Sequence, residues 1–508
     1  MNRSARSLSH LSLENWRASA ARLAGGLMKL RARRSKLRIA AAASVAIAIL
    51  GAILAPTMFA QQSRPNGVFH GFIPGVLAVS RVEYDGNNFG STETFPDIFN
   101  DPTISGVQGS IFIDEYLPLP IPGLPSIGTL PLTGITTSFS SKSEGALMLS
   151  ENGKFLTYMG YQGPVGAEGV SNSETPGATL TTNTAPTFNR EVALISANGA
   201  VSLTPETNAY SGDNPRACIS ADGTQFYMAG NADSTLNADG SGPGTTIGAR
   251  LGAPGSDTSI QLGTYLATDR PDESKKQHIK DNNFRGIGIF NGNLYVSKGS
   301  GGNGDDGVFQ VQNGTGNGLP TGTGNTIVKL LGDPATDPTT GAASPITPFG
   351  FFFANPTTLY VADEGTQTTD ASGNLLPDPM AGLQKWSLVN GTWVLDYVLQ
   401  AGLNLNQAES VSGYPVPTFT TGLRNLTGVV SPDGTVTLFA ITAQFSSISG
   451  GEPDPTRLVT ITDKLSAKTL PSSGPFGLLE KFATIETSHS GEVFRGVAFA
   501  PCGFCESK

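Results

Sequence analysis

Short apolar segments, each followed by a turn and a second apolar segment, recur along most of the chain. The clearest pair contains Phe-Arg-Gly: residues 281–297 read DNNFRGIGIFNGNLYVS, and residues 492–501 read EVFRGVAFAP. Four further segments share the pattern and start at Ser143, Pro215, Pro348 and Leu426. Most of the turns contain Asn-Gly or Asp-Gly, which accept the positive φ angles of tight hairpins. The pattern therefore predicts a β-hairpin at each position rather than a helix.

A small residue stands at the start of each predicted hairpin, and these residues define the repeat. They recur at intervals of 64 to 78 residues: Gly145, Ala217, Gly286, Gly350, Gly428 and Gly496. Two more apolar segments follow in most units, for example at 191–199 and 200–205, which gives four strands to a unit. Four-stranded units repeated around an axis form a β-propeller.

The two ends of the chain predict how the ring closes. The last unit stops after its first strand, at 497–501, whereas the first unit opens with a segment like a second strand, at 74–86. We therefore expect the C-terminal strand to complete the blade that the N-terminal strands begin. The sequence predicts an all-β fold, a six-bladed propeller over residues 64–501. Seven blades are the alternative if residues 64–110 or 229–280 contain another blade.

With these features the chain resembles secreted bacterial β-propellers, broadly of the lactonase-like, phytase-like and NHL-type kinds. The resemblance rests on the repeated hairpins, the Phe-Arg-Gly segments and the closing strand, and it covers about residues 64–501. It implies a fold and no particular activity, because propellers host many unrelated functions.

The first 60 residues differ in composition from the rest. Residues 1–38 contain ten Lys or Arg and one acidic residue, and residues 39–55 carry no charge. A basic segment followed by an apolar segment and small residues is typical of an export signal. An uncleaved membrane anchor is the alternative, since this apolar segment is at the short limit for a span. We expect an exported protein, periplasmic or extracellular.

The net charge of the chain limits its possible partners, and its cysteine content limits its possible disulfides. Without residues 1–38 the chain has 22 basic and 40 acidic residues, a net charge of −18. Such a surface repels nucleic acid and anionic lipid, so we expect neither as a partner.

Three cysteines are too few for a disulfide framework. Cys502 and Cys505 form a C-x-x-C in the tail 502–508, which is either a local disulfide or a free pair.

The residue before each small residue indicates where a ligand would bind. The first strand of a propeller blade lines the central channel, so these positions are expected near one ring: Glu144, Arg216, Arg285, Phe349, Thr427 and Arg495. Guanidinium groups bind carboxylate and phosphate, and Glu144 beside them would be a base or an ion-pair partner. The alternative is structural, with the arginines joining neighbouring blades through backbone carbonyls or Glu144.

Evidence for catalysis is sparse. No G-x-S-x-G occurs in the chain, so the nucleophile turn of α/β-hydrolases is absent. Glu144, His278 and His489 are the candidates for a catalytic base, because both histidines precede ring arginines in the sequence.

Acidic loops rich in Gly and Asn are the candidates for a metal site. They contain Asp85, Asp239, Asp305 and Asp306. Calcium prefers such oxygen-rich loops, and none of them completes the EF-hand pattern. Calcium is therefore the one cofactor that the sequence suggests.

These observations predict a secreted binding module with a polar or anionic small ligand at the channel mouth. A propeller hydrolase of esters, lactones or phosphoesters, with or without a metal ion, is the first alternative. A structural protein of the cell envelope is the second. The sequence gives no indication of oligomeric state.

Overall fold

A computed structural model describes residues 69–83, 107–138, 142–177, 186–232, 246–267, 281–299, 305–333, 345–366, 369–414, 416–445, 455–471 and 480–503. The chain divides into two units, residues 1–67 and 68–508, and the expected export signal lies outside the described residues. Within the described ranges, no helix is long and apolar enough to cross a membrane.

The described residues form antiparallel β-sheets and one short 3-10 helix, Val170–Asn172. Three sheets have four strands, one has five and one has eight. The eight-stranded sheet consists of two four-stranded groups, which are joined by the pairing of Thr136 with Tyr161. We call each four-stranded group a blade, and number the blades along the chain.

Blade 1 consists of β25 (Glu492–Phe499), β1 (Leu77–Glu83), β2 (Gln108–Tyr116) and β3 (Gly128–Ser138). Blade 2 consists of β4 (Leu147–Leu149), β5 (Phe155–Tyr161), β6 (Arg190–Ser196) and β7 (Val201–Glu206). Blade 3 consists of β8 (Pro215–Ile219), β9 (Phe226–Gly230), β10 (Arg250–Gly252) and β11 (Ile260–Gln261). Blade 4 consists of β12 (Ile287–Phe290), β13 (Asn293–Lys298), β14 (Gly307–Val311) and β15 (Ile327–Gly332).

Blade 5 consists of β16 (Pro348–Asn355), β17 (Thr358–Asp363), β18 (Gly382–Val389) and β19 (Thr392–Leu399). Blade 6 consists of β21 (Thr418–Val430), β22 (Thr435–Phe445), β23 (Arg457–Lys464) and β24 (Ala483–Thr487). The short β20 (Ala408–Glu409) pairs with the start of β21.

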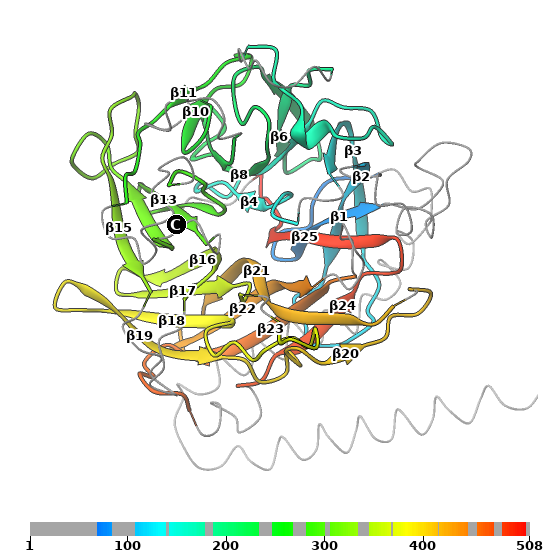
Figure 1. Ribbon diagram of the computed structural model, residues 1–508, viewed down its shortest axis with the longest axis vertical. Coiled ribbons are helices and arrows are strands. Elements are labelled where there is room, and N and C mark those ends of the chain that lie inside the picture. Colours follow the sequence, from blue (N-terminus) through cyan, green and yellow to red (C-terminus); the bar gives the residue numbers. More distant parts are fainter. Residues whose placement is uncertain are drawn as a thin grey trace, which may run out of the picture. The chain divides into compact units, whose positions relative to one another are not determined.

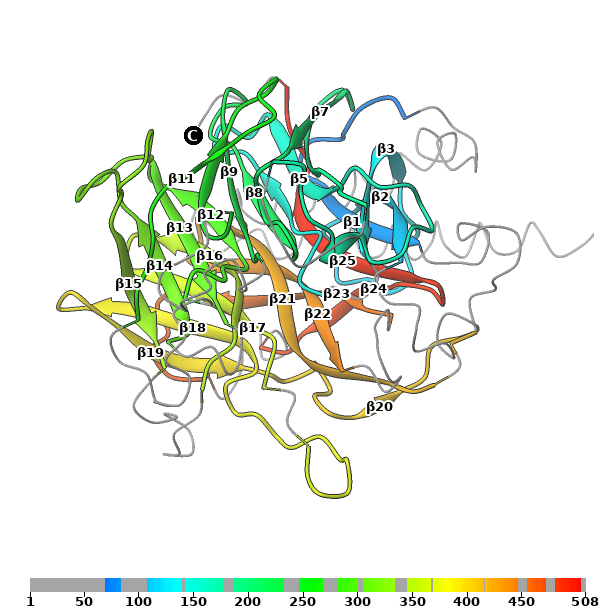
Figure 2. The ribbon, with the colours of Figure 1, turned by 45° about the horizontal axis from the view of Figure 1, so that its top comes forward.

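The hydrophobic core lies between neighbouring blades. Separate apolar clusters join blades 1 and 2, 2 and 3, 3 and 4, 4 and 5, and 5 and 6. A further cluster joins blade 6 to blade 1, where Phe439 and Leu458 pack with Val79 and Val497. The blades of the described residues thus form a closed ring around their first strands (Figures 1 and 2). The predicted all-β propeller arrangement is confirmed.

The ring closes through blade 1, as the sequence predicts. Strand β25 pairs with β1 along its whole length, with Leu77 opposite Phe499 and Glu83 opposite Glu492. The C-terminal strand therefore supplies the inner strand of a blade whose other strands come from the N-terminal part of the unit.

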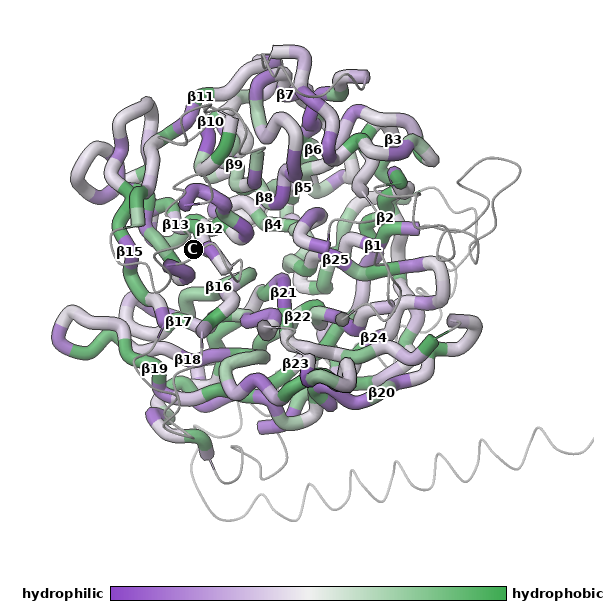
Figure 3. Tube along the Cα trace, viewed as in Figure 1, coloured by the Kyte–Doolittle hydropathy of each residue, from purple (hydrophilic) through white to green (hydrophobic). Residues whose placement is uncertain are grey.

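Turn chemistry and burial explain why these residues form strands. Hydrophobic and hydrophilic residues are mixed along the chain (Figure 3), and β8, β9 and β17 are buried along their whole length, as expected of strands that are packed on both faces. Between β12 and β13, Asn291 and Gly292 have φ angles of 49° and 66°, which is the geometry that a two-residue hairpin needs. The tight turn predicted at this Asn-Gly is confirmed.

One buried carboxyl in blade 1 predicts a pH-dependent stability. Burial raises the pKa of Glu115 on β2 to about 7, although its Oε1 accepts a hydrogen bond from the Ile73 amide at 2.7 Å. As the pH rises from about 4.5 to about 7, the unfolded chain loses this proton before the folded chain does, so stability falls. Glu115→Gln keeps the acceptor and removes the charge. The variant should match the wild type at pH 4 and be more stable by roughly 3 kcal/mol at pH 8.

The measurement is urea unfolding of both proteins across this pH range. Glu168→Gln is the control, since Glu168 is exposed. A difference between wild type and Glu115→Gln that does not change with pH would contradict the assignment.

Candidate functional site

The first strands of neighbouring blades approach one another closely at the predicted small residues. A Cβ atom on Gly286 of blade 4 would lie within 3.0 Å of the Phe349 carbonyl oxygen in blade 5. A Cβ atom on Gly350 would lie 2.7 Å from the Arg424 carbonyl oxygen in blade 6. The predicted need for small residues near the axis is confirmed at both positions.

The two Phe-Arg-Gly segments share one hydrogen-bond arrangement. The Gly286 amide donates to Ser297 Oγ on β13 at 2.8 Å, and this hydroxyl donates to the carbonyl oxygen of Phe349 in the next blade. The Gly496 amide donates to Ser80 Oγ on β1 at 2.7 Å, and this hydroxyl donates to a carbonyl oxygen of blade 2 at 2.8 Å. The segment is repeated because both copies make the same link between blades.

At the start of the first strands, two arginines share one carboxylate. Arg285 Nη1 forms an ion pair with Glu364 Oε1, and Arg424 Nε donates to Glu364 Oε2 at 3.1 Å. Arg216 on β8 donates from Nη1 to the Asn283 side-chain oxygen, and to the carbonyl oxygen of the following residue at 3.3 Å. We call Arg216, Arg285, Arg424 and Glu364 the mouth cluster.

The mouth cluster contains three positive groups and one carboxylate. Burial, followed by the positive charges of Arg216 and Arg424, lowers the pKa of Arg285 to about 9. Burial also lowers the pKa of Arg216. The Nε atoms of Arg216 and Arg285 are buried and have no hydrogen-bond partner within the described residues. The three arginines therefore lie close enough to repel one another, and two of their N–H donors have no partner within the described residues.

The negative charges of two aspartates near Arg285 raise its pKa, but both carboxyl groups are hydrogen-bonded to other residues. Asp306 Oδ1 accepts a hydrogen bond from Lys298 Nζ at 3.0 Å. Asp363 accepts hydrogen bonds from the amide and the hydroxyl of Thr347 at 2.7 and 2.5 Å, and burial raises its pKa to about 7. Neither aspartate forms an ion pair with a mouth-cluster arginine among the contacts of the described residues.

Glu144 is surrounded by hydrogen-bond donors. Its Oε2 accepts from the Thr137 hydroxyl at 2.8 Å and from the following amide at 2.9 Å, and its Oε1 accepts from Tyr161 Oη and from Asn214 Nδ2 at 2.8 Å. Burial raises its pKa, whereas these hydrogen bonds and the charge of Arg495 oppose the rise. The donors are all uncharged groups, and the carboxylate joins blades 1 and 2 to the segment before β8 through these hydrogen bonds.

Some of the predicted ring residues lie close together in the structure, and at one ring position a different residue from the predicted one is found. Arg216 and Arg285 lie in the mouth cluster, and Arg495 is buried near Glu144. In blade 6, an irregular pairing between Leu423 and Leu426 shifts the strand, so that Arg424 takes the ring position predicted for Thr427.

Glu364 was also missed by sequence reasoning. It follows the second strand of blade 5, in the segment DEG, whereas the repeat draws attention only to first strands. An acidic residue just after a second strand, at the same end of the sheet as the arginines, is the signal that could have identified it.

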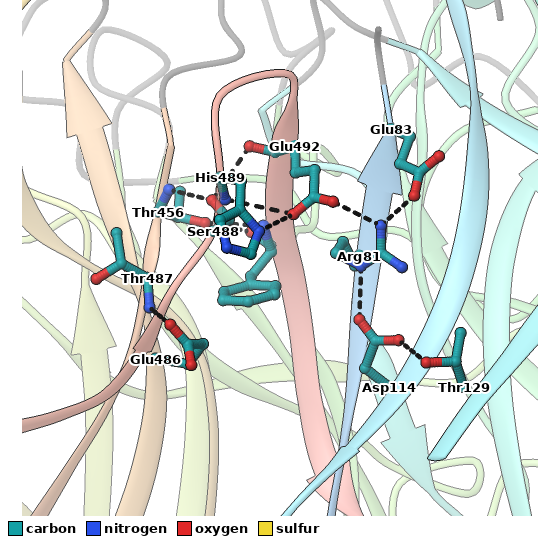
Figure 4. Close-up of polar contacts among 11 residues, drawn as sticks. Arg81, Glu83, Asp114, Thr129, Thr456, Glu486, Thr487, Ser488, His489 and Glu492 are labelled. Carbon is teal, nitrogen blue, oxygen red and sulfur yellow. Dashed lines mark hydrogen bonds and ion pairs between the residues drawn. The ribbon is translucent and has the colours of Figure 1, made fainter. Parts of the chain in front are cut away.

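His489 belongs to a different network, at the junction that closes the ring (Figure 4). Its ring is 82% exposed, and Nδ1 lies 3.0 Å from Glu492 Oε2. Glu492 Oε1 in turn contacts Arg81 Nη1 at 3.0 Å, and Arg81 Nε donates to Asp114 at 2.6 Å. These contacts link β25, β1 and β2 within blade 1. His278 lies outside the described residues.

The predicted calcium ligands fall into two groups. Asp85 and Asp239 lie outside the described residues. Asp305 and Asp306 form ion pairs with Lys329 and Lys298, respectively. In the part of the chain that the structure describes, no group of three or more His, Cys, Asp and Glu side chains is arranged to hold a metal ion.

Beyond the ring of small residues, the first strands enclose an apolar cavity of about 150 Å³. Its lining comes from the first strands of blades 1 to 6 as numbered in the described residues, and it includes Met148, Ile219, Ile289, Phe352, Thr427 and Val497. The channel is therefore charged at one end and apolar further along.

No protein-family model and no curated protein sequence matches the chain. Distant structural matches include a protein described as a 6-phosphogluconolactonase from Bacteroides uniformis (12% identity, TM-score 0.33, 84% of this chain and 99% of that chain). Another is described as an oxidoreductase (glucose dehydrogenase) from Thermus thermophilus (14%, 0.26, 71% and 96%). A third is the hemagglutinin-neuraminidase ectodomain of parainfluenza virus 5 (11%, 0.36, 70% and 75%). These are distant matches to β-propeller proteins, and they identify no family.

Proposed function

We propose that the chain is an exported binding module that holds a small anion, carboxylate or phosphate, at the mouth cluster. The observation that supports this most directly is that Arg285 and Arg424, from two blades, share one carboxylate, Glu364, while the charge of Arg216 from a third blade acts on Arg285. Two buried cations that share one carboxylate, with a third cation close by, create a local positive charge that a bound anion would help to balance alongside the nearby carboxylates.

The donor geometry favours an oxyanion. Guanidinium groups present paired N–H donors that match the oxygen spacing of carboxylates and phosphates. The Nε atoms of Arg216 and Arg285, which have no partner in the part of the chain that the structure describes, would supply such donors at the mouth cluster. On a chain with a strong negative net charge outside its first 38 residues, this local positive potential would select small anions over large acidic partners.

The cysteines support export. Cys502 is disulfide-bonded, whereas Cys218 is free and buried. Disulfides persist mainly in oxidising compartments. This agrees with the basic and apolar segments at the N-terminus, and on this proposal the ligand is a solute outside the cytoplasm.

The test is thermal unfolding of the purified protein with phosphate or acetate, compared with sodium chloride at the same ionic strength. A ligand at 100 times its dissociation constant should add about 2.7 kcal/mol of stability, which raises the melting temperature by a few degrees. Arg285→Gln should abolish this gain, because it removes a donor and leaves Glu364 paired with Arg424.

Lys154→Gln is the matched control, since Lys154 is an exposed cation in a hairpin turn of blade 2. It should keep the full gain. An equal gain from sodium chloride, or a gain that survives in Arg285→Gln, would count against anion binding at the mouth cluster.

A further inference from the structure

The apolar cavity begins very close to the charged end of the channel. On β25, Arg495 is followed by Gly496 and then by Val497, which lines the cavity. Arg285 stands three positions before Gly288, another lining residue. A strand rises about 3.3 Å per residue, so the two regions lie within about 10 Å of each other along these strands.

The cavity itself suits a hydrocarbon group. Met148, Ile289 and Phe352 in its lining are only partly buried by the protein, so an apolar group placed there would cover surface that is now exposed. A cavity of about 150 Å³ lined by aliphatic and aromatic side chains is large enough for a benzene-sized group. It is too small for a long acyl chain.

We propose that the anion held at the mouth cluster is amphiphilic, with a carboxylate at the arginines and a short alkyl or single-ring apolar body in the cavity. This rests on the proposed anion-binding function and adds the class of ligand. Carboxylate is favoured over inorganic phosphate because only an organic acid brings an apolar body that can fill the adjoining space.

The test is isothermal titration of the purified protein with acetate, butanoate, hexanoate and octanoate at constant ionic strength, with phosphate and 1-hexanol as further probes. Each buried methylene should tighten binding about fourfold until the cavity is full. Hexanoate should therefore bind far more tightly than acetate, and 1-hexanol far more weakly than hexanoate, because the alcohol lacks the charge that the arginines recognise.

Two variants separate the two parts of the site. Thr427→Phe adds bulk to the cavity lining and should remove the dependence on chain length while acetate binding stays unchanged. Arg285→Gln should weaken all the carboxylates to a similar degree. Ile121→Trp is the control for an added aromatic ring, because Ile121 is exposed in a loop of blade 1. Met148→Trp, at a half-buried position, repeats the cavity test if Thr427→Phe does not fold.

The outcomes are distinct. Affinity that rises with chain length, and loses this rise in the cavity variants, supports the amphiphilic ligand. Acetate and octanoate binding equally would overturn the amphiphile and leave anion binding standing. No binding of phosphate or any carboxylate would overturn both. Hexanol binding as tightly as hexanoate, with no effect of Arg285→Gln, would overturn the amphiphile and the mouth-cluster site in favour of a purely apolar one.

Discussion

Replacing Lys385 by methionine is expected to destabilise the protein by about 3–5 kcal/mol, the usual effect of leaving a buried charge without its partner. Lys385 on β18 and Asp463 on β23 are both fully buried, with Nζ and Oδ2 2.9 Å apart. Lys385 Nζ also donates to Tyr397 Oη at 2.9 Å, and Tyr360 Oη donates to Asp463 at 2.5 Å. The variant would leave the carboxylate between two phenols without a cation, at the contact between blades 5 and 6.

Urea unfolding of Lys385→Met measures this loss. The matched control is Lys468→Met, because Lys468 is 56% exposed and lies 3.8 Å from Asp396. Exposed pairs contribute less than about 1 kcal/mol, so the control should unfold close to the wild type. Equal midpoints for the two variants would show that the buried network does not hold blades 5 and 6 together.

Gly286→Ala should destabilise the protein by about 1–3 kcal/mol, the range for overpacking in a filled interior. The new methyl group would lie too close to the Phe349 carbonyl oxygen and 2.7 Å from Ser297 Oγ. Both atoms belong to the link between blades 4 and 5, so neither can move without breaking a hydrogen bond. The effect should appear as a lower melting temperature and a lower urea midpoint.

Gly322→Ala is the control for the glycine substitution itself. A Cβ atom on Gly322 would meet nothing within 4 Å, and its φ angle is not in the left-handed region. Alanine should therefore leave stability unchanged or raise it slightly, through the smaller entropy of its unfolded chain. If both alanine variants behave alike, close packing of the first strands does not explain the recurrent small residue.

The fold could be predicted from the repeat because short stretches of sequence determine its turns and mark its first strands. Asn-Gly at 291–292 specifies a tight turn by itself, and the small residues mark each first strand wherever they occur. The incomplete units at the two ends then leave one arrangement for closure, the pairing of β25 with β1. Each of these inferences needed only neighbours in sequence or a comparison of equivalent positions.

The candidate site was less predictable because its contacts join residues that no repeat relates. Glu364 lies 79 residues from Arg285 and 60 from Arg424. Arg424 reaches its position only because of the irregular pairing in β21, which shifts the register that a repeat alignment assumes. The network of Lys385 and Asp463 has the same character, since a separation of 78 residues leaves no local pattern.

The pairing of β25 with β1 also fixes an order of events during folding. Residues 492–499 are synthesised long after β1, and until they arrive one edge of β1 has no partner strand. An unpaired strand edge is a template for association with other chains, and pairing across the whole unit is intrinsically slow. A chain that ends before residue 492, through proteolysis or a premature stop, would keep that edge exposed and be prone to aggregation.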